Sequence, residues 1–142
     1  MMTKKQARPI SVYLLMAALL VQGLSGVAGG IGLVFDPTGG NIQIPVSWLE
    51  GSPFNSYFIP GLILLFALGL FPLIVLYGIW LRLSWSWMAA LLVALALVVW
   101  IFLEILIIGY HSRPPLQLIY GLLGIAMLVL VLLPSARRDF RE

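Results

Sequence analysis

Hydrophobic residues form four long runs along this chain, and polar residues gather between the runs and at the two ends. The runs cover about residues 10–34, 58–81, 85–110 and 116–133. None of them alternates between apolar and polar positions, as a strand with one buried face would. About 20 helical residues cross the roughly 30 Å hydrocarbon core of a bilayer, where the backbone must satisfy its own hydrogen bonds. We therefore predict an all-α membrane protein with four transmembrane helices in a compact bundle.

The composition agrees with a protein whose solvent is lipid. The 142 residues are 62% hydrophobic and 9% charged, and the mean hydropathy is +1.10. A soluble domain of this size could not cover so much apolar surface with so few charges. We predict a single membrane domain. The chain has no cysteine, which excludes disulfides, thiol redox chemistry and cysteine-ligated metals.

The basic residues indicate how the helices are oriented. Arg113 alone lies on one side of the predicted membrane. The others share the opposite side, and they are Lys4, Lys5, Arg8, Arg82, Arg137, Arg138 and Arg141. The positive-inside rule makes that side cytoplasmic, so both termini are predicted to be inside. The formal net charge of +3 therefore reports orientation and no nucleic-acid partner.

A cleaved signal peptide is the alternative for the first run. "MMTKKQARP" has the character of a positively charged n-region, and "LSGVAGG" offers small residues like those of a cleavage site. The apolar run is long for the core of a signal peptide, so we expect it to be retained as a span.

Small residues on two predicted helices favour close helix packing. Gly23, Gly26 and Gly30 are three and four residues apart on the first helix, and Gly121 and Gly124 form a shorter stripe on the fourth. Such stripes let two helix backbones approach each other. We favour packing within the bundle. The alternative is a dimerisation face or a slot for a flat ligand.

Pro72 falls near the middle of the second predicted helix. Proline removes one helical hydrogen bond and frees the carbonyl four residues earlier, which is that of Leu68. We predict a kink at this position, and Pro72 is a candidate hinge.

The segment of residues 35–57 is predicted to cap the extracytoplasmic end of the bundle. "DPTGG" is typical of a turn, and "NIQIPVSW" favours an extended piece with one apolar side. One helical turn over "PVSWLEG" is the alternative for the latter. Asp36 and Glu50 could bind a cation, but they are far apart in sequence and make a weak metal site. No metal ligand set is therefore predicted.

Three segments carry a resemblance. "GGIGLVFDPTGG", "PVSWLEGSPFNSYFIPGLILL" and "VVWIFLEILIIG" resemble a pattern found in small bacterial four-helix integral membrane proteins that have no known activity. The similarity covers most of the chain, from about residue 23 to residue 134. It implies a four-helix architecture in a bacterial plasma membrane. It carries no functional residue over to this sequence.

Glu104 is an acid inside an otherwise apolar run, with no basic residue within a helical turn. At 1.5 Å per residue it lies about 10 Å from His111, near the outer end of the third helix. Trp100, Glu104 and His111 share a helix face. A carboxylate facing lipid costs at least about 2.5 kcal/mol. We therefore predict that Glu104 points into the bundle and hydrogen-bonds with Gln117, Tyr120 or a water.

Two hypotheses for Glu104 stay open. In one, it exchanges a proton coupled to a substrate, with His111 as a relay. In the other, which we favour, it is a hydrogen-bonded acid that fixes helix register. The small multidrug transporters also have four helices and an essential glutamate. Theirs is on the first helix, where this chain has Gln22, and that difference argues against membership.

The sequence favours a non-enzymatic protein without a cofactor. A haem between helices usually needs two histidines, and His111 is the only one. No dinucleotide fingerprint, phosphate loop or Ser/His/Asp set is present. We predict a small plasma-membrane protein that acts by packing, as a subunit, a homo-oligomer such as a dimer, or a binder of membrane lipid or another hydrophobic ligand. A proton-coupled carrier using Glu104 is the alternative.

Overall fold

The computed structural model describes residues 8–40, 47, 54–109 and 116–141, and within these ranges the chain is helical and contains no strand. Its elements are α1 (Ile10–Phe35), α2 (Phe58–Leu65), the π-helical turn η3 (Phe66–Leu70), α3 (Phe71–Trp80), α4 (Ser86–Ile108), α5 (Leu116–Leu132) and α6 (Pro134–Arg141). Counted together, α2, η3 and α3 correspond to the second predicted run. The ends of the observed helices lie within two residues of the predicted ones.

Three helices in the described ranges are long and apolar enough to cross a membrane: α1, the continuous helix from α2 to α3, and α4. A fourth is added if α5 and α6, which meet at a bend of 64°, count as one span. Alone, α5 has 17 residues, which rise about 26 Å and fall slightly short of the hydrocarbon core.

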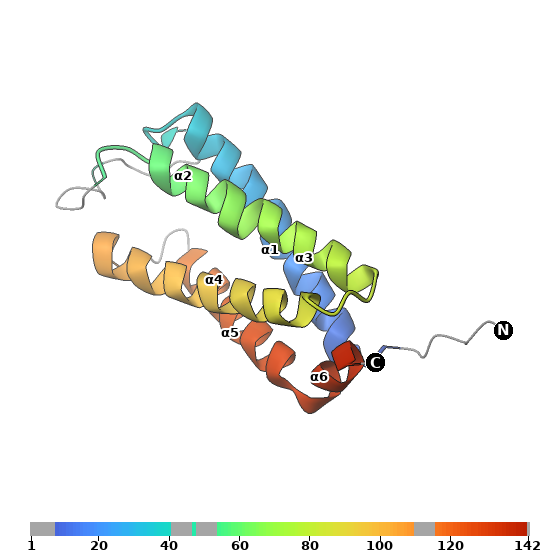
Figure 1. Ribbon diagram of the computed structural model, residues 1–142. Helices are drawn as coiled ribbons and strands as arrows, with labels where there is room; N and C mark the ends of the chain where they lie inside the picture. Colours follow the sequence, from blue (N-terminus) through green and yellow to red (C-terminus); the bar gives the residue numbers. More distant parts are fainter. Residues whose placement is uncertain (1–7, 41–46, 48–53, 110–115, 142) are drawn as a thin grey trace.

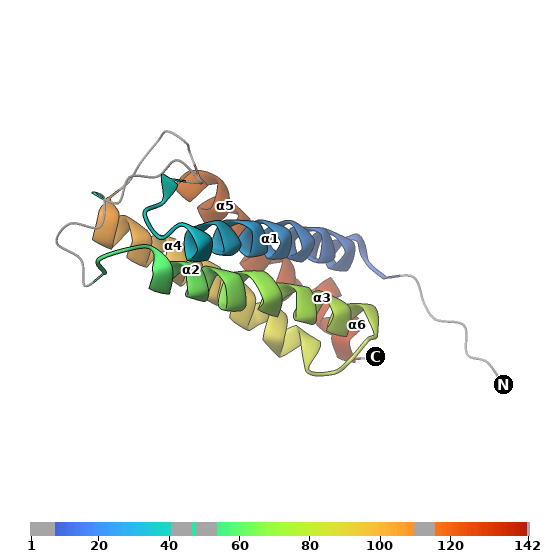
Figure 2. The same cartoon turned by 90° about the horizontal axis from the view of Figure 1, so that it is seen from above.

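Two helical hairpins make up the bundle (Figure 1). One joins α1 to the helix α2–η3–α3, and the other joins α4 to α5. Seen from above, α1 lies beside α2 and α3 along their whole length (Figure 2). Between the hairpins, the shared core includes Leu15 and Leu19 of α1, Val75 of α3, Leu97 of α4 and Met127 of α5. Their burial against each other is what holds the hairpins together.

The last helix, α6, was not expected from the sequence. The chain bends by 64° at Leu133, and α6 lies beside the start of α1 (Figure 1). The hydroxyls of Ser11 and Ser135 are 2.8 Å apart there. Ala136 is fully buried there. Asp139 of α6 lies 3.7 Å from the guanidinium of Arg82 in the α3–α4 turn. The beginning of α1 and all of α6 therefore lie at the same end of the bundle.

The α3–α4 turn closes α3 with a Schellman motif. Leu83 donates its N–H to Gly78 O at 2.9 Å and Arg82 donates to Ile79 O at 3.0 Å. The first residue after the helix in such a motif adopts a left-handed conformation, and glycine usually occupies this position. Here Arg82 has a φ of 58°. Its side chain reaches Asp139 from this position, so the turn also connects α3 to α6.

Residues 36–40 form the turn that "DPTGG" predicts. Gly39 donates its N–H to Asp36 O at 3.0 Å and has a φ of 82°. The side chain of Asp36 accepts hydrogen bonds from the N–H and the hydroxyl of Thr38. Most of the predicted cap, including Glu50, lies outside the described residues. What the structure does show is Tyr57 donating its N–H to Pro37 O at 2.8 Å, which brings the two ends of the loop together.

Candidate functional site

A polar contact joins α1 to η3 in the middle of the first hairpin. The amide Nε2 of Gln22 donates to the carbonyl of Leu68 at 2.9 Å, and Gln22 is only 2% exposed. Leu68 O is the carbonyl that Pro72 cannot satisfy, because proline has no N–H. The helix adjusts here with a π-turn, in which Phe71 donates to Phe66 O, and it continues as one span through the irregularity.

Sequence reasoning missed the role of Gln22. The signal was present, since Gln22 is the amide in the apolar run opposite the proline-containing helix. Its other amide atom, Oε1, is buried and accepts no hydrogen bond from the residues that the structure describes. The Gln22 side chain therefore satisfies the freed carbonyl of Leu68 but leaves its own Oε1 without a hydrogen-bond donor among the described residues. An unsatisfied buried polar atom is energetically unfavourable.

The predicted glycine stripe of α1 faces this contact. A Cβ built on Gly26 would lie 2.1 Å from Leu68 O, one on Gly30 would lie 2.6 Å from Leu65 Cα, and one on Gly23 would lie 2.4 Å from Leu73 Cδ2. The stripe is thus occupied by α2, η3 and α3 of the same chain. On α5, a Cβ built on Gly124 would lie 3.1 Å from Val98 Cγ2 of α4, whereas one on Gly121 would lie 3.5 Å from Ile101 Cγ2, which is an ordinary contact distance.

Glu104 lies near the C-terminal end of α4 beside a buried amide. Gln117 Nε2 is 3.4 Å from Glu104 Oε1 and 2.9 Å from the carbonyl of Gly109. Gly109 has a φ of 77° and ends α4. Of the two side chains expected to reach Glu104, the structure brings Gln117 close. It shows no hydrogen bond from Tyr120, which packs half-buried against the core instead.

Tyr57 extends this cluster from the start of α2. It is 4% exposed and packs with Leu33 and Phe54. Burial, and secondarily the negative charge of Glu104, raise the pKa of Tyr57 from 10.0 to about 12. A buried phenol keeps its proton because the charged form is poorly solvated. Tyr57 therefore keeps a neutral hydroxyl that the charge of Glu104 reaches electrostatically, an interaction that sequence reasoning did not foresee.

Two other candidates have simpler outcomes. Trp100 is half-buried and packs against the core. His111, the proposed proton relay, lies outside the described residues.

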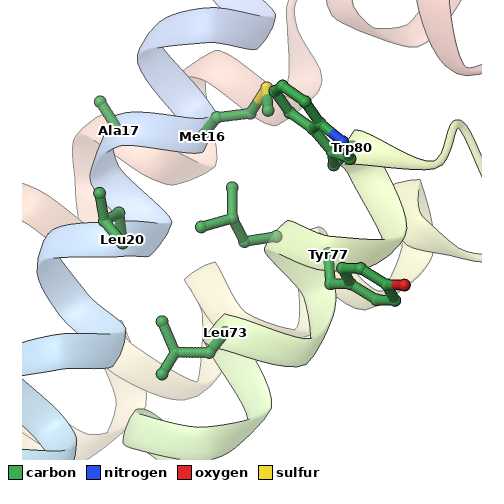
Figure 3. Close-up of a pocket in the computed structure, with 7 residues that line it drawn as sticks. Met16, Ala17, Leu20, Leu73, Tyr77 and Trp80 are labelled. Atoms are coloured by element: carbon green, nitrogen blue, oxygen red, sulfur yellow. The ribbon is translucent and has the colours of Figure 1, made fainter.

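A shallow apolar groove of about 480 Å³ lies between α1 and α3. Met16, Ala17 and Leu20 of α1 form one wall, and Leu73, Leu76, Tyr77 and Trp80 of α3 form the other. Figure 3 shows the two walls facing each other. Tyr77 and Trp80 are 64% and 68% exposed, so the groove opens to the surroundings of the bundle.

Arg8 lies at the end of this groove. Its Nη2 donates to the carbonyl of Trp80 at 3.3 Å, and its Nη1 is 3.6 Å from the sulfur of Met16. A cation on the last carbonyls of α3 is favoured by the helix dipole. Met16 and Trp80 both line the groove, so the end of the groove at Arg8 is polar and positively charged. The sequence predicts that this end faces the cytoplasm.

No family model, curated protein or solved structure matches this chain. Within the described ranges, no three His, Cys, Asp or Glu side chains come together as a metal site would require. The candidate sites are therefore defined by their geometry: the Gln22 contact, the cluster of Tyr57, Glu104 and Gln117, and the groove that ends at Arg8.

Proposed function

We propose that this chain is a multi-pass protein of a bacterial plasma membrane, with both termini in the cytoplasm, that binds a lipid or another hydrophobic ligand and catalyses no reaction. The observation that carries the proposal is the groove between α1 and α3. Its walls are almost entirely apolar, and it is open along its length. Apolar walls with few polar groups are typical of sites for hydrophobic ligands.

A role as a carrier that uses Glu104 is the second candidate, and the buried neighbours Gln117 and Tyr57 favour it. The groove lies far from this acid. Glu104 is 18 positions after Ser86, which follows the Trp80 end of the groove, a rise of about 27 Å along α4. The other end of the groove, at Leu73, is about 10 Å nearer to it. A ligand in the groove would therefore bind without contacting Glu104.

The test uses the full-length protein, extracted from native membranes under mild conditions. Native mass spectrometry measures the mass of the protein together with any bound ligand. We expect the wild type to retain a lipid-sized adduct and Ala17→Trp to lose it, because an indole at Ala17 fills the groove. Ala96→Trp is the matched control, since Ala96 is exposed on α4 outside the groove.

Two outcomes would contradict the proposal. An adduct lost equally in both variants would place the ligand elsewhere on the apolar surface. A reproducible heteromeric mass without adduct would make the chain a subunit, and the groove would then be a surface for a partner helix.

A further inference from the structure

The polar end of the groove carries a positive charge that the bundle does not neutralise. Arg82 has Asp139 as an ion-pair partner at 3.7 Å, whereas Arg8 forms no ion pair with a residue that the structure describes. Partial burial lowers the pKa of Arg8, and repulsion from Arg82 lowers it further, outweighing the opposite effect of Asp139. Asp139 offsets one of these two guanidinium charges, so the group retains one net positive charge to attract an anion near Arg8.

The donors of Arg8 are only partly used. A guanidinium has five N–H groups in a planar fork, which matches the geometry of phosphate oxygens. In this structure Arg8 donates to Trp80 O and touches Met16 Sδ. Further donors remain for a ligand at the mouth of the groove.

The groove has the dimensions of part of a lipid tail. From Leu73 to Trp80 it follows eight residues of α3, a rise of about 10 Å. Trp80 and Tyr77 stand at its open side, and aromatic side chains of this kind are enriched at the level of lipid headgroups. Apolar walls below such a level and a cation at it fit an amphiphile that has a tail and an anionic head.

We propose that the groove and Arg8 together form a binding site for an anionic phospholipid of the cytoplasmic leaflet. One acyl chain lies between α1 and α3, and the headgroup phosphate accepts hydrogen bonds from Arg8. This inference rests on the proposed function and adds the class of ligand. Basic residues beside transmembrane helices on the cytoplasmic side are a general means of recognising anionic headgroups.

The test uses the full-length protein, delipidated in detergent and titrated with phosphatidylglycerol or with phosphatidylcholine of the same acyl chains. Native mass spectrometry measures both affinities. We expect phosphatidylglycerol to bind more tightly, and Arg8→Gln to weaken it about fivefold while phosphatidylcholine is unaffected. Arg8→Lys, which keeps the charge but loses the fork, should fall between the wild type and Arg8→Gln.

The control is Arg138→Gln, which removes the same charge from an exposed position on α6. It should leave the affinity for phosphatidylglycerol unchanged. An equal loss in Arg138→Gln would show general attraction to a positive surface and would overturn the inference. Competition by inorganic phosphate at concentrations equal to the lipid would also overturn it, since the site would then recognise the free anion.

Failure of this inference can be told apart from failure of the proposed function. If both lipids bind equally, Arg8→Gln has no effect and Ala17→Trp abolishes binding, then the groove binds lipid without headgroup selection. If neither lipid binds and Ala17→Trp changes nothing, the groove is not a ligand site. Unfolding temperatures of the Arg8 variants near that of the wild type ensure that a weaker affinity reflects the site and not loss of the fold.

Discussion

At the scale of single residues, two buried amides inside this apolar bundle each compensate for a specific break in the backbone. Gln22 donates to the carbonyl that Pro72 leaves unsatisfied, and Gln117 donates to the carbonyl of Gly109, where α4 ends. Water does not reach such groups in a bilayer, so a side chain must replace it. These contacts explain why amides occur where the surrounding sequence is almost entirely aliphatic.

The raised pKa of Tyr57 predicts how the free energy of unfolding depends on pH. Its pKa is 10.0 when exposed and about 12 in the folded protein. Below pH 10 the phenol is neutral in both states. Between pH 10 and pH 12 only the unfolded chain releases the proton, so the contribution of Tyr57 to the free energy of unfolding falls as the pH rises. Tyrosinate absorbance should show a late step near pH 12 that is absent in Tyr57→Phe.

A second variant tests the cause of the raised pKa. Glu104→Gln should shift the late step toward lower pH, since it removes the smaller of the two causes of the raised pKa. A step near pH 12 that survives in Tyr57→Phe would contradict the assignment.

At the scale of elements, the first hairpin depends on direct backbone contact. Gly26 of α1 and Gly69 of η3 lie at the crossing, where a Cβ on Gly69 would be 2.7 Å from the backbone nitrogen of Val27. Without a hydrophobic driving force between helices in lipid, such close packing and the Gln22 hydrogen bond are what stabilise the pair. The second hairpin is less close, because side chains separate α4 from α5 at Gly121.

This difference predicts unequal effects of the same substitution. In Gly26→Ala the new methyl group would meet Leu68 O at 2.1 Å and Gly69 Cα at 2.8 Å, both of them backbone atoms that move only if the helices separate. We expect a loss of about 1–3 kcal/mol in the free energy of unfolding. Gly121→Ala meets a side chain at 3.5 Å and should change it by less than about 0.5 kcal/mol.

The measurement is reversible unfolding by sodium dodecyl sulfate in mixed micelles, followed by circular dichroism. Equal losses in the two variants would mean that backbone contact at the crossing does not distinguish the hairpins.

At the scale of the whole molecule, the two ends of the bundle differ. At one end, α6 is fastened to α1 by Ser11 and Ser135, while Arg137 lies 4.8 Å over the ring of Trp87, whose Nε1 donates to Val131 O at 2.9 Å. Arg8 and the groove lie at this end. Glu104, Gln117 and Tyr57 lie at the other. The groove and Glu104 therefore lie in separate parts of the molecule.

This separation predicts that Glu104 is not a proton carrier. In proteoliposomes holding the full-length protein, proton flux should be the same for the wild type and Glu104→Gln, because the acid is held by Gln117 and the groove does not reach it. The measurement follows a pH-sensitive dye in the lumen, with empty vesicles as the control. A flux that is present in the wild type and lost in Glu104→Gln would favour the carrier instead.

The sequence by itself determined the helical class, the bounds of the long helices and the carbonyl that Pro72 would free. These properties are local, since they depend on uninterrupted apolar length and on the covalent structure of proline. The sequence also predicted that Glu104 would point into the bundle toward Gln117, Tyr120 or a water, and the structure brings Gln117 close to it.

Only the tertiary structure decided which partners the remaining groups find. Gln22 meets Leu68 across 46 positions and Ser11 meets Ser135 across 124, and no periodicity along one helix encodes such distances. The groove likewise depends on how α1 and α3 lie against each other, since its walls come from residues 16–20 and 73–80. Apolar length fixes that a helix forms, whereas the shapes of facing surfaces fix which helix it contacts and where space is left between them.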